Sequence, residues 1–208
     1  MAGKSSKKAA SIDMTAMCDV AFLLLTFFIL TATAKIPEAL PVDTPSSTVQ
    51  TKLPESNLAT LTIGGKGKVF FDLKGREVRI RTLELMSQKY GVEFTDEEKA
   101  KFSLMEGIGV PIGNLKQLIG MKTAERSKAG QPGIPKDSLD NQLSDWVKNA
   151  RIANNEANNA NGSKEELHIA IKGDAKEEYP SIRKVMDILQ DQGINSFSLV
   201  TGLRGKNF

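Results

Sequence analysis

The sequence predicts an α+β protein in which a single N-terminal transmembrane helix precedes a small domain of sheet and helices with a helical insertion. Three patterns favour this class: an apolar stretch at 14–34, alternating apolar residues at 61–73 and 167–171, and apolar residues at helical spacing in 182–189. The chain of 208 residues is long enough for a membrane segment and one domain with its own core. We expect a tail at 1–13, the helix at 14–34, an extended linker at 35–57 and the α+β domain at 58–208, with the insertion at about 91–163.

The composition argues against several classes of function. The formal net charge is +3, which leaves no strongly basic face for nucleic acid. With one cysteine and one histidine, most metal sites and Cys/His catalysis are unfavourable. No nucleophile–base pair is recognisable either. We therefore expect a protein without enzyme activity, cofactor, metal or nucleic-acid partner.

The apolar stretch from Met14 to Ala34 has the length of a transmembrane helix. It spans about 21 residues, close to the roughly 20 that cross the hydrocarbon core, and Asp19 is its only charged residue. Lysines at 4, 7 and 8 precede it, opposed only by Asp13. This excess of positive charge predicts a cytoplasmic N-terminus, with the chain beyond Ala34 across the membrane.

A cleaved signal peptide is the alternative. The basic start, the apolar stretch and the Ala32-Thr33-Ala34 triplet resemble a secretory leader with its cleavage site. The stretch is long for such a leader, and two aspartates lie at or in it, so we favour a retained anchor. Sequencing the N-terminus of the mature protein distinguishes the two.

Asp19 is the candidate functional residue of this helix. A charged aspartate at the centre of a membrane helix costs about 2.5–3.5 kcal/mol on insertion scales, so removal from water favours its protonated form. A carboxyl that gains and loses a proton there could carry it between the two sides. Thr15, Thr26 and Thr33 share one helix face with Asp19, while the opposite face is apolar.

Simpler interpretations of these residues remain open. Asp19 lies about five residues into the segment, so its side chain could reach the cytoplasmic edge of the membrane without any role. The threonines could be ordinary helix-packing residues. Because one helix cannot enclose a proton path, proton coupling at Asp19 requires helices from partner proteins.

Two segments resemble the ExbD/TolR family. DMTAMCDVAFLLLTFFILTATA, residues 13–34, is similar to the family's membrane segment, with the Asp19-Val20 pair and the following FLLLTFF as its core. LHIAIKGDAKEEYPSIRKVMDILQDQGINSFSLVT, residues 167–201, is similar to the C-terminal unit. Two features depart from the family pattern: Ala16 stands where proline is frequent, and 91–163 exceeds what the compact family domain needs.

The resemblance implies a role in energy transduction. In that family the aspartate at the position of Asp19 responds to protons, and a multi-span ExbB- or TolQ-type partner surrounds a pair of helices. The assembly drives TonB or TolA, which act on the outer membrane. The implied protein is a single-pass inner-membrane homodimer, paired through its helix and its periplasmic domain, with an ExbB-like and a TonB-like partner. TonB-linked and Tol-linked roles are not separated, and a membrane-tethered binding module without proton coupling is the alternative from another class.

The linker carries prolines at 37, 41 and 45, which favour an extended connector. In the resembling family this stretch can be ordered by pairing with the soluble domain. That makes the segment from Leu40 to Ser47 a candidate regulatory element, although a plain tether explains it equally well. Its candidate residues are Leu40, Pro41, Pro45, Ser46 and Ser47.

The ends of the soluble domain have clear patterns. Alternation on either side of a turn at 64–67 predicts a hairpin, which a short strand at 77–81 and a helix at 82–90 ending at Gly91 follow. Near the C-terminus we expect a strand at 167–171, a helix ending at Gly193 and a last strand around 197–199. The helices should pack on one sheet face, with His168 exposed on the other.

The insertion is helical by pattern. Thr95 and Glu98 form a capping box, Gly107 closes that helix, and Asn114 starts a short one. An apolar stripe follows, for which core packing is favoured over a partner site at its tryptophan; it comprises Leu139, Leu143, Trp146, Val147 and Ala150. The asparagine-rich run at 154–162 has no periodicity, so we expect a polar linker.

Overall fold

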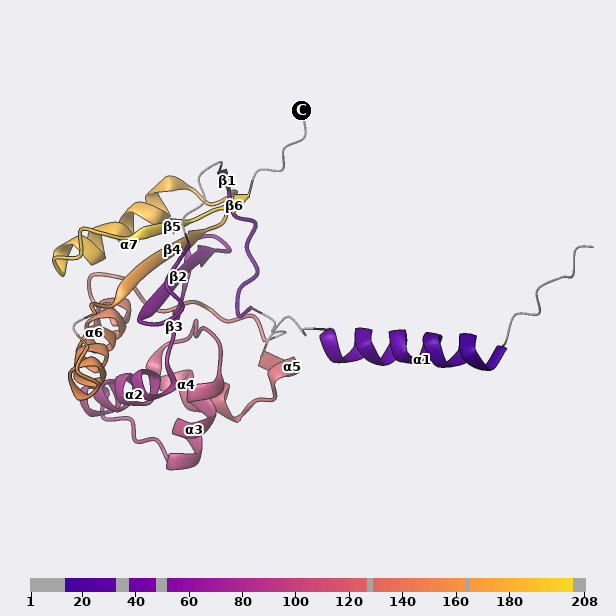
Figure 1. Ribbon diagram of the computed structural model, residues 1–208. Coiled ribbons are helices and arrows are strands. Elements are labelled where there is room, and N and C mark those ends of the chain that lie inside the picture. The colour runs from indigo at the N-terminus through magenta and orange to yellow at the C-terminus, as the bar shows by residue number, and fades with distance from the viewer. Residues whose placement is uncertain (1–13, 33–37, 48–51, 127–128, 164, 204–208) are drawn as a thin grey trace, which may run out of the picture. The chain divides into compact units, whose positions relative to one another are not determined.

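The computed structural model describes residues 14–32, 38–47, 52–126, 129–163 and 165–203 (Figure 1). The chain divides into two compact units, Met1–Ile36 and Pro37–Phe208. Each unit is described by itself.

The first unit contains helix α1 (Met14–Thr31), whose 18 residues span about 27 Å at 1.5 Å per residue. None of its residues is buried. Among the described residues it is the one helix long and apolar enough to cross a membrane. Ala34, the predicted end of the segment, lies outside the described residues.

The second unit is built on a four-stranded sheet. Its strands are β2 (Leu58–Gly64), β3 (Lys68–Leu73), β4 (His168–Gly173) and β5 (Ser198–Val200), in the order β3-β2-β4-β5. The predicted hairpin is confirmed, since β2 and β3 pair antiparallel with Leu61 opposite Phe71. The β2–β4 and β4–β5 pairs are parallel. His168 is exposed, as expected.

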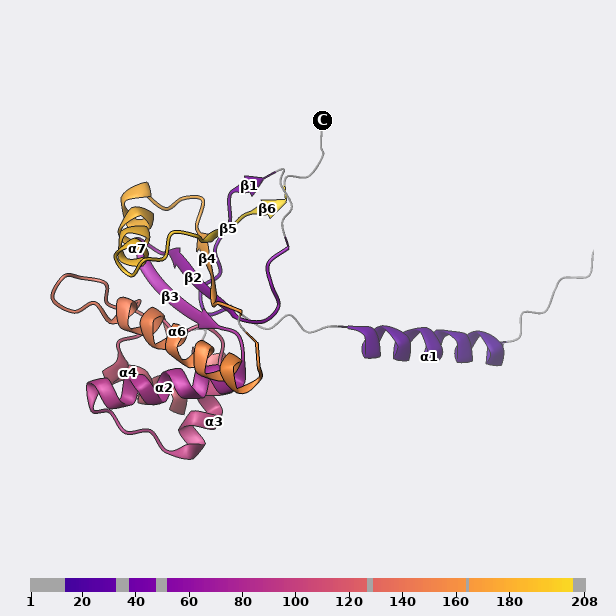
Figure 2. The same cartoon turned by 60° about the vertical axis from the view of Figure 1, so that its left-hand side comes forward.

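The helices of the second unit are α2 (Arg76–Tyr90), α3 (Asp96–Leu104), α4 (Ile112–Gly120), α5 (Thr123–Arg126), α6 (Gln142–Ala160) and α7 (Tyr179–Asp191). Buried residues of α2, α3, α4, α6 and α7 belong to the same core cluster as the sheet. Figure 2 shows α6 and α7 on the same side of the sheet. Alternate residues of β2 and β4, including Leu61 and Ile171, share one core cluster with Trp146 and Leu189. The predicted α+β class is confirmed.

The strand predicted at 77–81 is wrong, because these residues form the first turns of α2. Val78, Thr82, Leu83 and Met86 are its buried positions, at spacings of four, one and three that only a helix brings to one side. The predicted helix end is confirmed, since Gly91 adopts a left-handed conformation with φ of 66°.

Helix α6 is shifted and longer than predicted. It begins at Gln142, where the side chain of Asn141 accepts a hydrogen bond from the backbone of Ser144. Leu139 therefore lies before the helix and is fully exposed, in contrast to the prediction. The other members of the stripe, from Leu143 to Ala150, are buried, which confirms core packing.

The polar linker predicted at 154–162 is also wrong, because α6 continues through this run to Ala160. Asn154 and Asn158 are buried there, and the side-chain amides of both donate to the carbonyl of Glu165. These asparagines stabilise the chain segment that leads into β4.

The insertion forms part of the same core as the sheet. Trp146 packs against Phe71 of β3 and Phe102 of α3, with ring centroids 6.1 Å apart in both pairs. Phe71 and Ile108 exchange two backbone hydrogen bonds of 2.8 Å, and Ile134 donates another to Val69. The outer edge of β3 is therefore covered by the insertion.

The bounds of α3 and α4 differ in part from the prediction. The capping box of Thr95 and Glu98 is confirmed. However, α3 ends at Leu104, before Gly107, and α4 begins at Ile112, two residues before Asn114.

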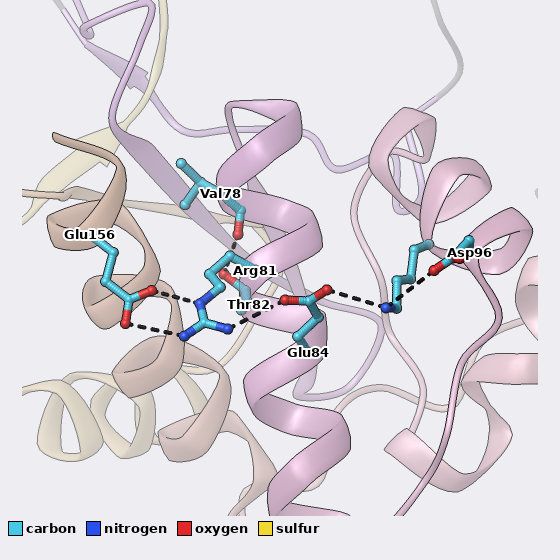
Figure 3. A network of polar contacts seen from close by, with 7 residues as sticks. Val78, Arg81, Thr82, Glu84, Asp96 and Glu156 are labelled. Atoms are coloured by element: carbon cyan, nitrogen blue, oxygen red, sulfur yellow. Dashed lines mark hydrogen bonds and ion pairs between the residues drawn. The ribbon is translucent and has the colours of Figure 1, made fainter. Parts of the chain in front are cut away.

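A chain of ion pairs joins three helices of the domain (Figure 3). Arg81 of α2 binds Glu156 of α6, with 2.6 Å between Nε and Oε2, and also contacts Glu84 of its own helix. Glu84 in turn accepts from Lys99 of α3, which pairs with Asp96. Because these side chains are solvent-accessible, the network contributes more to the orientation of the helices than to stability.

Candidate functional site

Asp19 lies in the second turn of α1 and its side chain is exposed. No basic side chain of the described residues pairs with it. The helix around it presents large apolar side chains, with Val20 56% and Phe28 65% exposed. A carboxyl on such a helix needs lipid-excluded surroundings, which neighbouring helices supply in membrane proteins.

The predicted polar face is present in part. Thr15 precedes Asp19 by four residues and Thr26 follows it by seven, so the helical period puts both on the side of Asp19. The hydroxyl of Thr26 donates to the carbonyl of Leu23 at 2.9 Å, which satisfies its donor and leaves its lone pairs as acceptors. Thr33 lies outside the described residues.

The linker segment 38–47 docks on the folded domain. Glu38 forms an ion pair with Lys172 of β4, and the carbonyl of Asp43 accepts from the backbone of Ala175 at 2.7 Å. Leu40 and Val42 pack so closely on Gly64 that a Cβ added there would lie 2.8 Å from Val42 Cγ1.

The end of this segment forms a short parallel pair. Strand β1 (Ser46–Ser47) pairs with β6 (Gly202–Leu203), with Ser46 opposite Gly202. The carbonyl of Pro45 accepts from the backbone of Gly202 at 2.9 Å. Pro41 and Pro45 are exposed. Of the five candidate linker residues, Leu40 contacts the sheet directly, while Pro45, Ser46 and Ser47 lie at the pairing with β6.

The docking of this segment depends on a small number of polar contacts and on the packing of two apolar side chains. A backbone hydrogen bond contributes about 1 kcal/mol net. The hydrogen bonds of Asp43 and Pro45 and the ion pair of Glu38 add to the apolar packing of Leu40 and Val42 on Gly64. A ligand or partner that binds the undocked segment more tightly than the docked one would shift this equilibrium.

One further charged residue lies near the core and was not singled out from the sequence. Glu106 borders a cavity of about 10 Å³ next to Trp146, and burial, followed by the nearby charge of Asp72, raises its pKa. The indole Nε1 of Trp146 is buried without a hydrogen-bond partner among the described residues. The cavity is large enough for one water molecule. No local pattern in the sequence signals this arrangement, because its residues come from β3, α2, α3 and α6.

An exposed apolar helix that bears one carboxyl, followed by an α+β domain with a docked linker segment, fits the class of single-pass membrane proteins with one folded domain. The sequence matches the family described as biopolymer transport protein ExbD/TolR over residues 5–203. The chain therefore belongs to the ExbD/TolR family, and the insertion lies within the matched range. No curated protein and no solved structure matches it.

Members of this family are inner-membrane-anchored accessory proteins of biopolymer transport without enzyme activity, and they work with ExbB- or TolQ-type membrane proteins. The apolar helix α1 fits a single-pass protein of this kind.

Proposed function

We propose that this chain is the accessory subunit of an ExbB–ExbD-type motor, which uses proton-motive force to energise TonB-dependent transport across the outer membrane. The observation that carries this proposal is Asp19, the single charged residue in an apolar helix of a chain that belongs to the ExbD/TolR family. The N-terminus lies in the cytoplasm and the α+β domain in the periplasm.

Asp19 acts as the proton-coupling residue. Each elementary charge that crosses a potential of 100 mV releases about 2.3 kcal/mol, so protonation and release at one carboxyl can bias the position of a helix. Thr15, Thr26 and Thr33 extend the polar face along which a proton or water approaches. The rest of α1 is covered by lipid, by a second copy of the chain and by an ExbB-like multi-span partner.

The linker controls whether the movement of α1 reaches the α+β domain. In the docked state, Leu40 to Ser47 lie on the α+β domain, and release of the segment lets the domain reach a TonB-like protein. The short pairing of β1 with β6, two residues on each strand, supports a reversible switch of this kind.

The proton-coupling role is tested by Asp19→Asn, which keeps the size of the side chain and removes its titration. In cells that lack the native subunit, we expect this variant to abolish energised transport while expression and complex formation with the multi-span partner stay near normal. Asp187→Asn, at an exposed position of α7, is the matched control. Full transport by Asp19→Asn would contradict the mechanism.

Deletion of the chain and copurification of the full-length protein together distinguish the remaining alternatives. A TonB-linked role predicts loss of energised uptake with an intact envelope when the chain is deleted. A Tol-type role predicts the reverse, an envelope defect with normal uptake. A membrane-tethered binding module predicts that no multi-span membrane protein copurifies.

A further inference from the structure

A polar pocket of about 360 Å³ lies at the end of the sheet where β4 and β5 begin. This volume is within the range of small-molecule sites. Its walls come from α6, from the residues before β4 and from the loop between α7 and β5, and Figure 1 shows α6 beside the starting end of β4. Its polar lining residues include Arg151, Asn155, Glu166, Asn195 and Ser196.

Arg151 is held in place from outside the pocket. Its Nη1 donates to the carbonyl of Gln192 at 3.1 Å, and the side-chain amide of Gln192 donates to the carbonyl and hydroxyl of Ser144, at 2.9 and 2.8 Å. These bonds connect α6 with the end of α7. Nε and Nη2 of Arg151 have no hydrogen-bond partner among the described residues, and that edge of a guanidinium matches the two oxygens of a carboxylate.

The opposite charge on the pocket wall is also not neutralised. Glu166 is exposed and forms no ion pair with Arg151 or with any other base in the described part of the chain. Asn155, Asn195 and Ser196 add amide and hydroxyl groups, which bind peptide-like polar groups. The pocket therefore presents one cation, one anion and neutral donors and acceptors around a single cavity.

We propose that this pocket binds a small zwitterionic ligand of the amino-acid or dipeptide class. The ligand carboxylate binds the free edge of Arg151, and its ammonium group binds Glu166. Two of the groups that hold the ligand, Arg151 and Asn155, come from α6 of the insertion.

The pocket is separated from the docked linker segment 38–47. Glu38 and Asp43 contact the domain at Lys172 and Ala175, at and beyond the far end of β4, whereas Glu166 and Leu167 precede the start of that strand. The docked segment 38–47 therefore does not cover the pocket, and the proposal does not depend on the motor function.

The test is calorimetric titration of the full-length protein in detergent with the dipeptide alanyl-alanine. We expect saturable binding with a dissociation constant of roughly 1 mM or tighter. The C-terminal amide of this dipeptide lacks the carboxylate and the N-acetyl form lacks the ammonium group, so we expect both to bind at least tenfold more weakly. No saturable binding of the unmodified dipeptide would overturn the proposal.

Variants of the chain connect each end of the ligand with one residue. Arg151→Gln should weaken the binding of the dipeptide by about tenfold or more, because a charge-assisted pair of hydrogen bonds is lost. It should have little effect on the binding of the C-terminal amide, which lacks the carboxylate. Glu166→Gln should show the same pattern with the acetylated ligand. Arg183→Gln, on the exposed surface of α7, is the matched control and should bind normally.

A further variant separates loss of binding from loss of folding. Arg151→Lys keeps the positive charge but not the planar fork, so it should bind with intermediate affinity if the fold is intact, as judged by circular dichroism. Equal affinities of the wild-type protein, Arg151→Gln and Glu166→Gln would overturn the assignment of the site.

Discussion

At the scale of residues, the roles of Gly109 and Glu106 are set by the side chains that pack around them. Gly107 and Gly109 lie where the insertion runs alongside β3, and a Cβ added to Gly107 would lie 3.4 Å from the carbonyl oxygen of Phe71. A Cβ added to Gly109 would lie 2.3 Å from the ring of Phe70, so this glycine allows the insertion to approach β3. Glu106 shows a similar dependence on its surroundings, because its raised pKa comes from burial first and from Asp72 second.

Glu106 makes the stability of the domain depend on pH. Its carboxyl has a higher pKa in the folded state than in the unfolded chain, so its protonation favours folding. This contribution is fully present below the unfolded pKa and is lost as the pH rises through the folded pKa. We expect Glu106→Gln to raise the melting temperature at about pH 8 and to have a smaller effect at about pH 5.

The measurement for Glu106 uses the fluorescence of Trp146, the one tryptophan of the chain, which is 1% exposed. Glu93→Gln, at an exposed position, is the control and should leave the melting temperature unchanged. A destabilised Glu106→Gln at both pH values would show that the ionised carboxyl is stabilising in the folded protein.

At the scale of elements, few polar contacts hold the linker segment 38–47 on the folded domain. Its extended backbone is a local consequence of proline, whereas its docking depends on residues more than a hundred positions later in the chain. In the described part of the linker, secondary structure is limited to the two residues of β1, which pair with β6.

Lys172→Gln tests the docking of the linker, since it removes the ion pair with Glu38 while leaving β4 intact. We expect amide hydrogen exchange in residues 38–47 to become several-fold faster, because the docked state loses part of its small stabilisation. Lys176→Gln, an exposed lysine of the following turn, is the matched control. Unchanged exchange in Lys172→Gln would mean that the ion pair does not hold the segment.

At the scale of the whole second unit, the insertion and the sheet form one cooperative core. Helices α2 and α6 pack together, and the rings of Trp146, Phe71 and Phe102 join the insertion to β3. A separately folding insertion would unfold in a transition of its own, whereas a shared core predicts one transition.

Leu143→Ala tests this shared core, and Leu139→Ala is its control from the same predicted stripe. Leu143 is 0% exposed and Leu139 is fully exposed, so the first should cost about 2–5 kcal/mol of unfolding free energy and the second close to nothing. Urea unfolding is followed by Trp146 fluorescence and by circular dichroism. Two separated transitions, or a large effect of Leu139→Ala, would contradict a single core.

Local patterns in the sequence were sufficient to predict several elements of this protein and its family. The length and apolarity of α1, the place of Asp19, the hairpin, the capping box at Thr95 and the end of α2 at Gly91 all depend on neighbours within a few residues. For the same reason the family could be recognised from the membrane segment and the C-terminal unit, and the match over residues 5–203 agrees.

Only the tertiary structure decided which polar residues are buried and which segments dock. Asn154 and Asn158 extend α6 because a carbonyl at Glu165 accepts their amides, and residues 77–81 are helical because Val78 faces the core. The linker docks because Lys172 and Gly202 lie where it passes. The partners of these residues are brought together by folding, so no pattern along the chain reveals them.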